Sequence, residues 1–396
     1  MFLGGSLDTC PLYSGKEGIY MKDTTTEQKG LYIKIAVGII CALFLVGLVA
    51  VQYINRTFHT YRIVRETQLT YNKDNWTAKL GDNLLLYNKD GMRCMDSKGK
   101  MIWDVTYQIQ DPCVAIDGNM VAVGGYGEHL IYVMDETGRI GEIDTNLPIR
   151  NLCVAEEGYI GVVLDDNHVY WIYTYDVKGN EITKARTTME QSGYPLSISL
   201  SPNGKLLGVS YLYLDAGKVE SNVAFYNQGE VGQNYAGQYM SGFIYPEIVP
   251  ELHYMNNSLA AGISNGRLMF YEGSEKPQVL KEILLNDMVQ AIFWGDKNVI
   301  LVYDGTAEQG RYFMQIYDQQ GTLILERSFD MEYTDIVSQN EIVTIYNNEE
   351  MLVFTLDGKE RFKGSLGGGI HTIVTTSKKY RYLVLFEEMY KVIELE

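Results

Sequence analysis

Histidine is the side chain best suited to acid–base chemistry and zinc binding near neutral pH, and the chain has five of them. They are His59, His129, His168, His253 and His371. No H-E-x-x-H pair occurs, which is the spacing that places two histidines of one helix around zinc. The five cysteines form no C-x-x-C or C-x-x-H pair. These residues therefore predict neither a metal centre nor a disulfide framework.

A glycine-flanked serine, a glycine-rich run and an acidic pair are the other motifs that could carry chemistry. The run GISNG (262–266) matches the G-x-S-x-G elbow, but the residues after it alternate like a strand instead of a helix, so we interpret it as a hairpin turn. The run GSLGGG (364–369) opens no predicted helix and is interpreted as a turn between repeats. Asp165 and Asp166 lack the acidic spacing of a calcium loop and are interpreted as solvated turn residues.

The charge of the chain limits its partners. The chain has 33 basic and 50 acidic residues, a formal net charge of −17, and all of this excess follows residue 54. So acidic a domain is repelled by nucleic acid phosphates and by anionic lipid headgroups. Nucleic acid is therefore an unfavourable partner, whereas cationic proteins and neutral polymers are compatible with the charge.

One long uncharged segment runs from Ile35 to Ile54. At 1.5 Å per residue it spans about 30 Å, the hydrocarbon thickness of a bilayer. The segment lacks the polar face of a core helix and a convincing signal-peptide cleavage site. We predict an uncleaved transmembrane helix at 35–54 after a tail at 1–34. The flanking charges nearly balance, so the orientation rests on the short tail, which favours a cytoplasmic amino terminus and an extracytoplasmic domain.

Repeated strand–turn–strand units fill the rest of the chain. One hairpin recurs from Thr77, Cys113, Cys153, Ser197, His253, Ile292, Asp335 and Thr372. A second turn follows seven of these copies, starting at Asp96, Asp135, Asp176, Asn227, Gly273, Asp318 and Asp357. Units of roughly 40–50 residues with four strands have the size of propeller blades. The pattern predicts an all-β propeller of about eight four-stranded blades, with seven as the alternative.

The last repeat lacks one strand. Its copy ends at Glu396 on the third strand, and a ring must cover that edge. The segment YRIVRETQL (61–69) alternates suitably and has no other partner. We therefore expect the 61–69 strand to close the propeller domain, which would occupy 61–396.

Several runs resemble known propellers. MDSKGKMIW, with Trp103, resembles one tryptophan-docking repeat of quinoprotein-like propellers, and SLSPNGKLLGVS resembles the WD-repeat hairpin. The quinoprotein motif is confined to one repeat, so no quinone cofactor is expected. The segments NRTFHTYRIVRE, GYPLSISLSPNGKLLGVSYLY and VAFYNQGEVGQN resemble a Gram-positive bacterial membrane protein family catalogued as domain of unknown function 5711. That resemblance implies a propeller and a membrane location, but no cofactor or catalytic residue.

The long fourth repeat carries the most suggestive surface. Its GEVGQNYAGQYMSGFIYPEIVP segment places aromatic rings among glycines and small polar residues, a composition typical of protein-binding loops. The candidate partner-binding residues are Glu230, Gln233, Asn234, Tyr235, Tyr239, Phe243 and Tyr245, and the alternative is that the rings pack the blade edge. We hypothesise a non-enzymatic, membrane-anchored module that binds another envelope protein; the alternative is a hydrolase or lyase acting on a cell-wall glycan.

The first 20 residues have no strand or helix period and no signal-peptide pattern. Lys16-Glu17-Gly18 can be encoded by a string that contains a ribosome-binding consensus a few codons before Met21. We therefore expect translation to start at Met21 and residues 1–20 to be a misassigned start, the alternative being that Met1 is the true start.

Overall fold

The computed structural model describes residues 24–68, 75–188, 192–306 and 310–396 of the protein. It divides into two units, Met1–Arg56 and Thr57–Glu396. The expected start at Met21 and most of the tail lie outside the described residues. The described residues of the first unit form one helix, α1 (Thr24–Ile54). Every described side chain in it is exposed, although Ile35 to Leu48 are almost all apolar. Among the described residues, no helix reaches the length and apolarity of a bilayer crossing, so the expected transmembrane helix stays a prediction.

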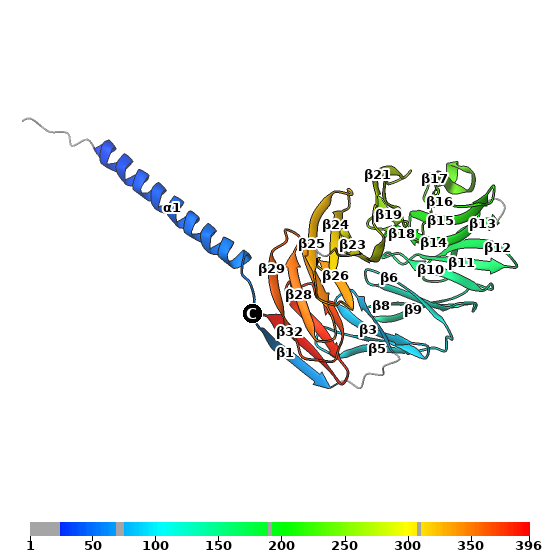
Figure 1. The fold of residues 1–396 in the computed structure, drawn as a ribbon, viewed down its shortest axis with the longest axis horizontal. Helices are drawn as coiled ribbons and strands as arrows, with labels where there is room; N and C mark the ends of the chain where they lie inside the picture. The colour runs from blue at the N-terminus through cyan, green and yellow to red at the C-terminus, as the bar shows by residue number, and fades with distance from the viewer. Residues whose placement is uncertain (1–23, 69–74, 189–191, 307–309) are drawn as a thin grey trace, which may run out of the picture. The chain divides into compact units, whose positions relative to one another are not determined.

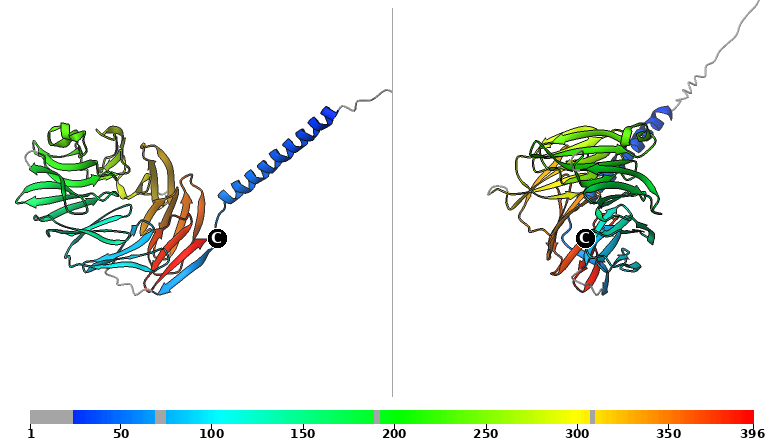
Figure 2. Two further views of the ribbon diagram at one scale, coloured as in Figure 1. Left: turned by 180° about the vertical axis from the view of Figure 1, so that it is seen from behind. Right: turned by 90° about the vertical axis from the view of Figure 1, so that its right-hand side faces the viewer.

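The second unit is a propeller of eight four-stranded antiparallel sheets, which confirms the predicted fold class and favours eight blades over seven. In Figure 1 the colours pass from blade to blade around the ring, and Figure 2 shows the same order from behind. The first strand of each blade contacts the first strand of a neighbouring blade, so these strands line the centre. We call the side of the ring where these inner strands begin the start face, and the opposite side the end face.

The strands of the first four blades are as follows. Blade one holds β2 (Trp76–Leu80), β3 (Asn83–Asn88), β4 (Gly91–Met95) and β5 (Met101–Thr106). Blade two holds β6 (Pro112–Asp117), β7 (Met120–Gly125), β8 (Leu130–Asp135) and β9 (Gly138–Asp144). Blade three holds β10 (Ile149–Val154), β11 (Ile160–Asp166), β12 (Val169–Tyr175) and β13 (Glu181–Thr188). Blade four holds β14 (Tyr194–Leu200), β15 (Leu206–Asp215), β16 (Lys218–Asn227) and β17 (Tyr239–Tyr245), with the short 3-10 helices η1 (Gly232–Asn234) and η2 (Ala236–Gln238) before β17.

The other four blades complete the ring. Blade five holds β18 (Glu251–Tyr254), β19 (Leu259–Ile263), β20 (Arg267–Glu272) and β21 (Gln278–Leu284). Blade six holds β22 (Val289–Trp294), β23 (Asn298–Asp304), β24 (Tyr312–Asp318) and β25 (Leu323–Phe329). Blade seven holds β26 (Asp335–Gln339), β27 (Ile342–Tyr346), β28 (Glu350–Thr355) and β29 (Glu360–Ser365). Blade eight holds β30 (Ile370–Thr375), β31 (Arg381–Phe386), β32 (Met389–Leu395) and β1 (Tyr61–Gln68).

A repeated aspartate turn joins the third and fourth strands of several blades. The Asp96 carboxylate accepts the N–H groups of Lys98 and Lys100, both at 2.8 Å. Asp176 and Asp318 accept N–H groups two and four residues ahead in the same way. Gly99 closes its turn at a φ of +75°, a conformation that glycine adopts without strain. This local chemistry explains why the repeats were visible in the sequence.

Apolar clusters between neighbouring blades hold the ring together. Each cluster contains buried residues of two adjacent sheets, and together the clusters cover all eight junctions. Representative members from the two sides of each junction, in ring order, are Leu85 and Val123, Ile131 and Val162, Val163 and Val209, Phe225 and Tyr271, Phe270 and Leu301, Ile316 and Ile345, Val353 and Val384, and Leu383 and Leu86. The core is therefore distributed between blades, so that each blade depends on its two neighbours.

Blade eight is assembled from both ends of the unit. β1 pairs antiparallel with β32 from Tyr61 opposite Leu395 to Gln68 opposite Met389. The Glu396 carbonyl also accepts the N–H groups of His59 and Thr60. The blue and red strands lie side by side in Figures 1 and 2. β1 thus covers the edge of β32 that would otherwise be unpaired.

Glu394 on β32 links three segments of blade eight. Its carboxylate accepts Lys378 Nζ at 2.7 Å, Arg381 Nη2 at 2.9 Å and Arg62 Nη2 of β1 at 3.1 Å. Hydrogen bonds from Lys378 and Arg381 lower the pKa of Glu394 to about 2. The side chain itself is only 17% exposed, whereas its partners are more exposed and better screened.

We expect Glu394→Gln to lower the free energy of unfolding at pH 7 by about 1–2 kcal/mol, because a lowered carboxyl pKa stabilises the fold and the exposed partners reduce the effect. This stabilisation is complete above the ordinary glutamate pKa of 4.5 and is lost as the pH falls towards about 2. Urea unfolding of both proteins at pH 7 and pH 3 measures the difference, which should shrink at pH 3. An equal difference at both pH values would contradict this role of the charge.

Candidate functional site

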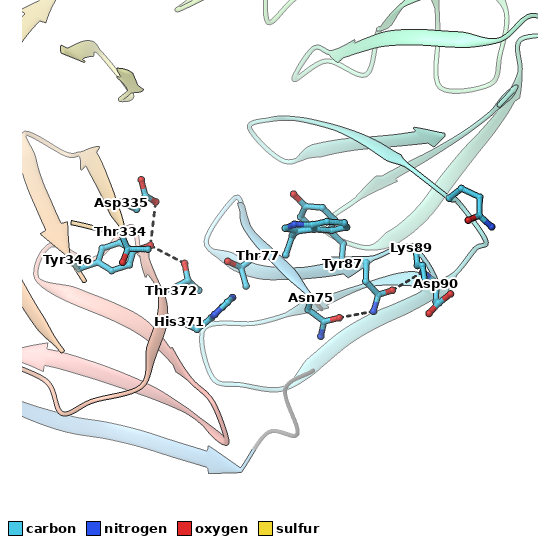
Figure 3. A pocket seen from close by; sticks show the side chains of 13 residues that line it. Asn75, Thr77, Tyr87, Lys89, Asp90, Thr334, Asp335, Tyr346, His371 and Thr372 are labelled. Carbon is cyan, nitrogen blue, oxygen red and sulfur yellow. Dashed lines mark hydrogen bonds between the residues drawn. The ribbon is translucent and has the colours of Figure 1, made fainter. Parts of the chain in front are cut away.

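A cavity of about 860 Å³ opens at the start face between blades seven, eight and one. Its lining comes from the first turns and strands of these blades and from Gln110 ahead of blade two: Asn75, Trp76, Thr77, Tyr87, Asn88, Lys89, Asp90, Gln110, Thr334, Asp335, Tyr346, His371 and Thr372. In Figure 3 one group of side chains comes from blade one, and the other from blades seven and eight. The cavity therefore exists only because blade eight meets blade one.

One wall of the cavity is fixed by a chain of hydroxyl groups. The Tyr346 hydroxyl donates to the Asp335 carboxylate at 3.3 Å and lies 3.2 Å from the Thr372 hydroxyl (Figure 3). Burial raises the pKa of the Asp335 carboxyl and raises the pKa of Tyr346 to about 12. Burial also lowers the pKa of His371. These shifts favour the neutral forms of His371 and Tyr346 and weaken the tendency of Asp335 to ionise.

The predicted partner-binding residues of blade four do not share one surface. Glu230, Gln233, Asn234, Tyr235 and Tyr239 are exposed around η1 and η2 at the end face. Tyr235 is 50% and Tyr239 45% exposed. The Asn234 amide donates to the Glu230 and Val231 carbonyls, which fixes the short helical turn. These five residues can reach a partner, and their proposed role in binding stays a prediction.

Phe243 and Tyr245 face the junction of blades four and five instead. Tyr245 is 3% exposed, and its hydroxyl contacts the Tyr271 hydroxyl at 3.0 Å and donates to Glu282 at 3.3 Å. Phe243 packs against the same core. Tyr245 is thus buried and Phe243 partly buried, because β17 runs from the end face to the start face and turns alternate side chains towards blade five. This corrects the expectation that both lie on an exposed loop. For these two residues the alternative, packing of the blade edge, describes the structure.

Sequence reasoning missed a set of exposed apolar side chains on the start face of blades four and five. We call it the blade 4/5 surface: Leu214, Val219, Ile248, Leu284 and Met288, which are between 43% and 77% exposed. Leu214 and Val219 face each other at the tip of the β15–β16 hairpin, beyond Tyr194, the first residue of β14. In the sequence, the only indication that Leu214 and Val219 are exposed is that they flank the Asp-Ala-Gly turn (215–217).

An ion network ties the two blades together beneath this surface. Arg267 of β20 contacts Glu247 at 3.2 Å and Glu282 of β21 at 3.1 Å. Glu247 lies in the connection between β17 and β18, next to Ile248. Ile248 and Leu284 are therefore held at one junction by charged neighbours, while their own side chains stay open to solvent.

The remaining candidate residues have structural roles. His253 lies on the inner strand of blade five against Trp294, at 5.1 Å between ring centroids, and surrounding protein lowers its pKa to about 4 even though part of the ring faces the channel. Ser264 accepts the N–H groups of Gly266 and Arg267 in the β19–β20 hairpin. Asp165 is not merely solvated, since it pairs with Arg150 at 2.7 Å.

Trp103 of the docking-like motif is also structural, because it is 8% exposed in the junction between blades one and two. The Cys94 and Cys153 thiols are buried, which raises both of their pKa values to about 12. Among the described residues, no three His, Cys, Asp or Glu side chains gather into a group that could hold a metal ion. The docking-like motif and the two buried thiols therefore contribute to packing and do not line the candidate sites.

Comparison with known proteins gives a family and a fold. Residues 54–395 match the family of unknown function DUF5711. No curated protein matches the chain. Two structures of Sqt1 from Chaetomium thermophilum are similar to the chain. The first has 12% sequence identity and a TM-score of 0.52, and the match covers 85% of this chain and 100% of that chain. The second, which is bound to the N-terminus of the ribosomal protein L10, has 11% sequence identity and a TM-score of 0.50, and the match covers 86% of this chain and 100% of that chain. BamB from Moraxella catarrhalis has 10% identity and TM-score 0.48 over 85% of this chain and 100% of its own.

Proposed function

The chain belongs to DUF5711, a family of unknown function, and we propose that it is a protein-interaction module that binds its partner through the blade 4/5 surface. The observation that carries this proposal is the exposure of five apolar side chains at the start-face ends of two adjacent blades. Scattered single apolar residues are normal on a protein surface, whereas a group of this kind on one face is typical of interaction sites. In this proposal the domain acts by binding and not by catalysis; the glycan hydrolase or lyase stays a hypothesis.

The charges around the surface indicate the chemistry of the partner. Acidic residues predominate there: Glu220, Glu247, Glu251, Glu282 and Asp287 stand against Lys218 and Arg267. Arg267 is already paired with two of the acids. The best complement is therefore a protein segment that combines apolar and basic side chains. Sqt1, one of the similar structures, is bound to a protein terminus, which supports a ring of this type as a holder of polypeptide.

We expect the double variant Leu214→Asp and Leu284→Asp to weaken partner binding at least about tenfold, because each new carboxylate would have to be desolvated against an acidic surface. Quantitative mass spectrometry of material captured by the tagged full-length chain measures the loss. Tyr235→Ala with Tyr239→Ala is the matched control on the end face of the same blade. A partner lost with the end-face pair and retained by the start-face pair would restore the loop predicted from sequence and contradict the surface proposed here.

We also infer that α1 anchors the propeller in a cell membrane, with the tail in the cytoplasm and the propeller outside. The support is the uncharged sequence from Ile35 to Ile54 and the absence of a polar face among the described residues 35–48. Alkaline carbonate washing of membranes should leave the chain in the pellet. Protease added to intact wall-stripped cells should digest the propeller. Release by carbonate contradicts the anchor, and protection of the propeller contradicts the orientation.

A further inference from the structure

The start-face cavity has an aromatic platform that lies outside the proposed blade 4/5 surface. Trp76 is 51% exposed on the cavity wall, and its ring centroid lies 5.7 Å from that of Tyr87. The two residues are directly opposite on β2 and β3, so backbone pairing sets the position of the indole. A large ring held open to a cavity offers a flat apolar face to a ligand, at a cost in exposed apolar area.

Uncharged hydrogen-bonding groups surround this platform. Asn88 donates to Asn75 at 2.7 Å, and the pair lies beside Trp76 in the β2–β3 hairpin. Hydroxyls of Thr77, Thr334 and Thr372 lie on the walls, and Figure 3 shows Thr77 and Thr372 on either side of the junction of blades one and eight. Amides and hydroxyls both donate and accept, as a ligand rich in hydroxyl groups requires.

Charge in the cavity argues against an ionic ligand. Lys89 is the basic side chain among the described lining residues, and Asp90 and Asp335 are the acidic ones. Burial raises the pKa of Asp335 and lowers the pKa of His371, which moves both groups towards their neutral forms. Phosphate or carboxylate ligands bind where several cations converge, and no such cluster lines this cavity in the described part of the chain.

We propose that this cavity is a binding site for a neutral saccharide, with one sugar ring stacked on Trp76 and its hydroxyls bonded to the surrounding amides and hydroxyls. The C–H bonds on one face of a pyranose ring are weakly positive and complement the negative face of an indole. The cavity volume falls within the roughly 300–1,000 Å³ of small-molecule sites, enough for a short oligosaccharide. In this proposal the site binds the saccharide, with no hydrolysis of the saccharide required. The site is separate from the blade 4/5 surface.

Calorimetric titration of the purified full-length chain tests the site. The probes are maltotriose, cellotriose, mannotriose and N,N′,N″-triacetylchitotriose, with trigalacturonate as the acidic arm. Each is titrated to about 10 mM, which nearly saturates a site with a dissociation constant of about 1 mM. At least one neutral trisaccharide should bind saturably, and Trp76→Ala should weaken it about tenfold or more. Trp76→Phe retains a ring and should lose less.

Tyr126→Ala is the matched control, since Tyr126 is 49% exposed on the start face but does not line the cavity. It should bind like the unmodified chain, and thermal unfolding should show that all variants are folded. Binding by no neutral trisaccharide, binding by trigalacturonate alone, or equal binding by Trp76→Ala and the unmodified chain would each overturn the proposal.

Discussion

Replacing β1, Tyr61–Gln68, with eight alternating glycine and serine residues is expected to lower the free energy of unfolding by about 3–6 kcal/mol. The replacement removes the side chains that favour the strand and leaves the edge of β32 without a stable partner. The chain still continues from this segment into blade one, but the segment no longer holds blade eight to blade one. Urea unfolding measures the loss, and self-association through the open edge should accompany it.

The matched control is the same replacement in β13, Glu181–Thr188, which is also eight residues long and is the outermost strand of blade three. Hydrogen exchange separates the two variants. Loss of β1 should speed exchange at the junction of blades eight and one, around Leu84–Leu86 and Leu383–Leu385. Loss of β13 should not, because blades eight and one remain joined. Equal exchange at this junction in both variants would contradict the closing role of β1.

Phe225→Ala is expected to lower the free energy of unfolding by about 3–5 kcal/mol, because it leaves a large cavity in the packed junction of blades four and five. Phe225 is fully buried, and its ring centroid lies 4.9 Å from that of Tyr271 and 6.4 Å from that of Phe243. Urea unfolding measures the change. Partner capture should fall as well, since Leu284 of the blade 4/5 surface lies at this junction.

Ile244→Ala is the control for stability. Ile244 is 64% exposed, so its truncation should change the free energy of unfolding by about 0.5 kcal/mol or less. A loss from Phe225→Ala as small as that from Ile244→Ala would mean that the aromatic junction does not hold the two blades together.

Eight blades were predictable because the turns that separate their strands are formed by residues close together in the sequence. The turns at Asp96, Asp176 and Asp318 repeat the same hydrogen bonds within five residues, so each copy can be recognised in the sequence. The strand at 61–69 could be proposed by elimination, and the structure has β1 at that edge of blade eight. Four strands per blade and a shared ring follow from such local signals.

The sites were harder to predict because they depend on contacts between distant residues. Tyr239 and Tyr245 begin and end one strand, and Tyr239 is exposed whereas Tyr245 is buried. This difference depends on the packing of Tyr245 against the next blade, where it contacts Glu282, a residue distant in the sequence. The cavity joins Trp76 to Asp335 and His371, which are brought together by ring closure. Nothing in the neighbourhood of Trp76 in the sequence identifies its partners.

Site-specific photo-cross-linking in cells of the source organism tests most directly the claim that the blade 4/5 surface binds a protein. A photoreactive phenylalanine analogue at Met288, which is 77% exposed, should give a discrete adduct with one protein, and one at Tyr239 on the end face should not. Leu214→Asp with Leu284→Asp should abolish the adduct from position 288. An adduct from position 239 but not from 288, or an adduct at 288 that survives the double substitution, would contradict the account.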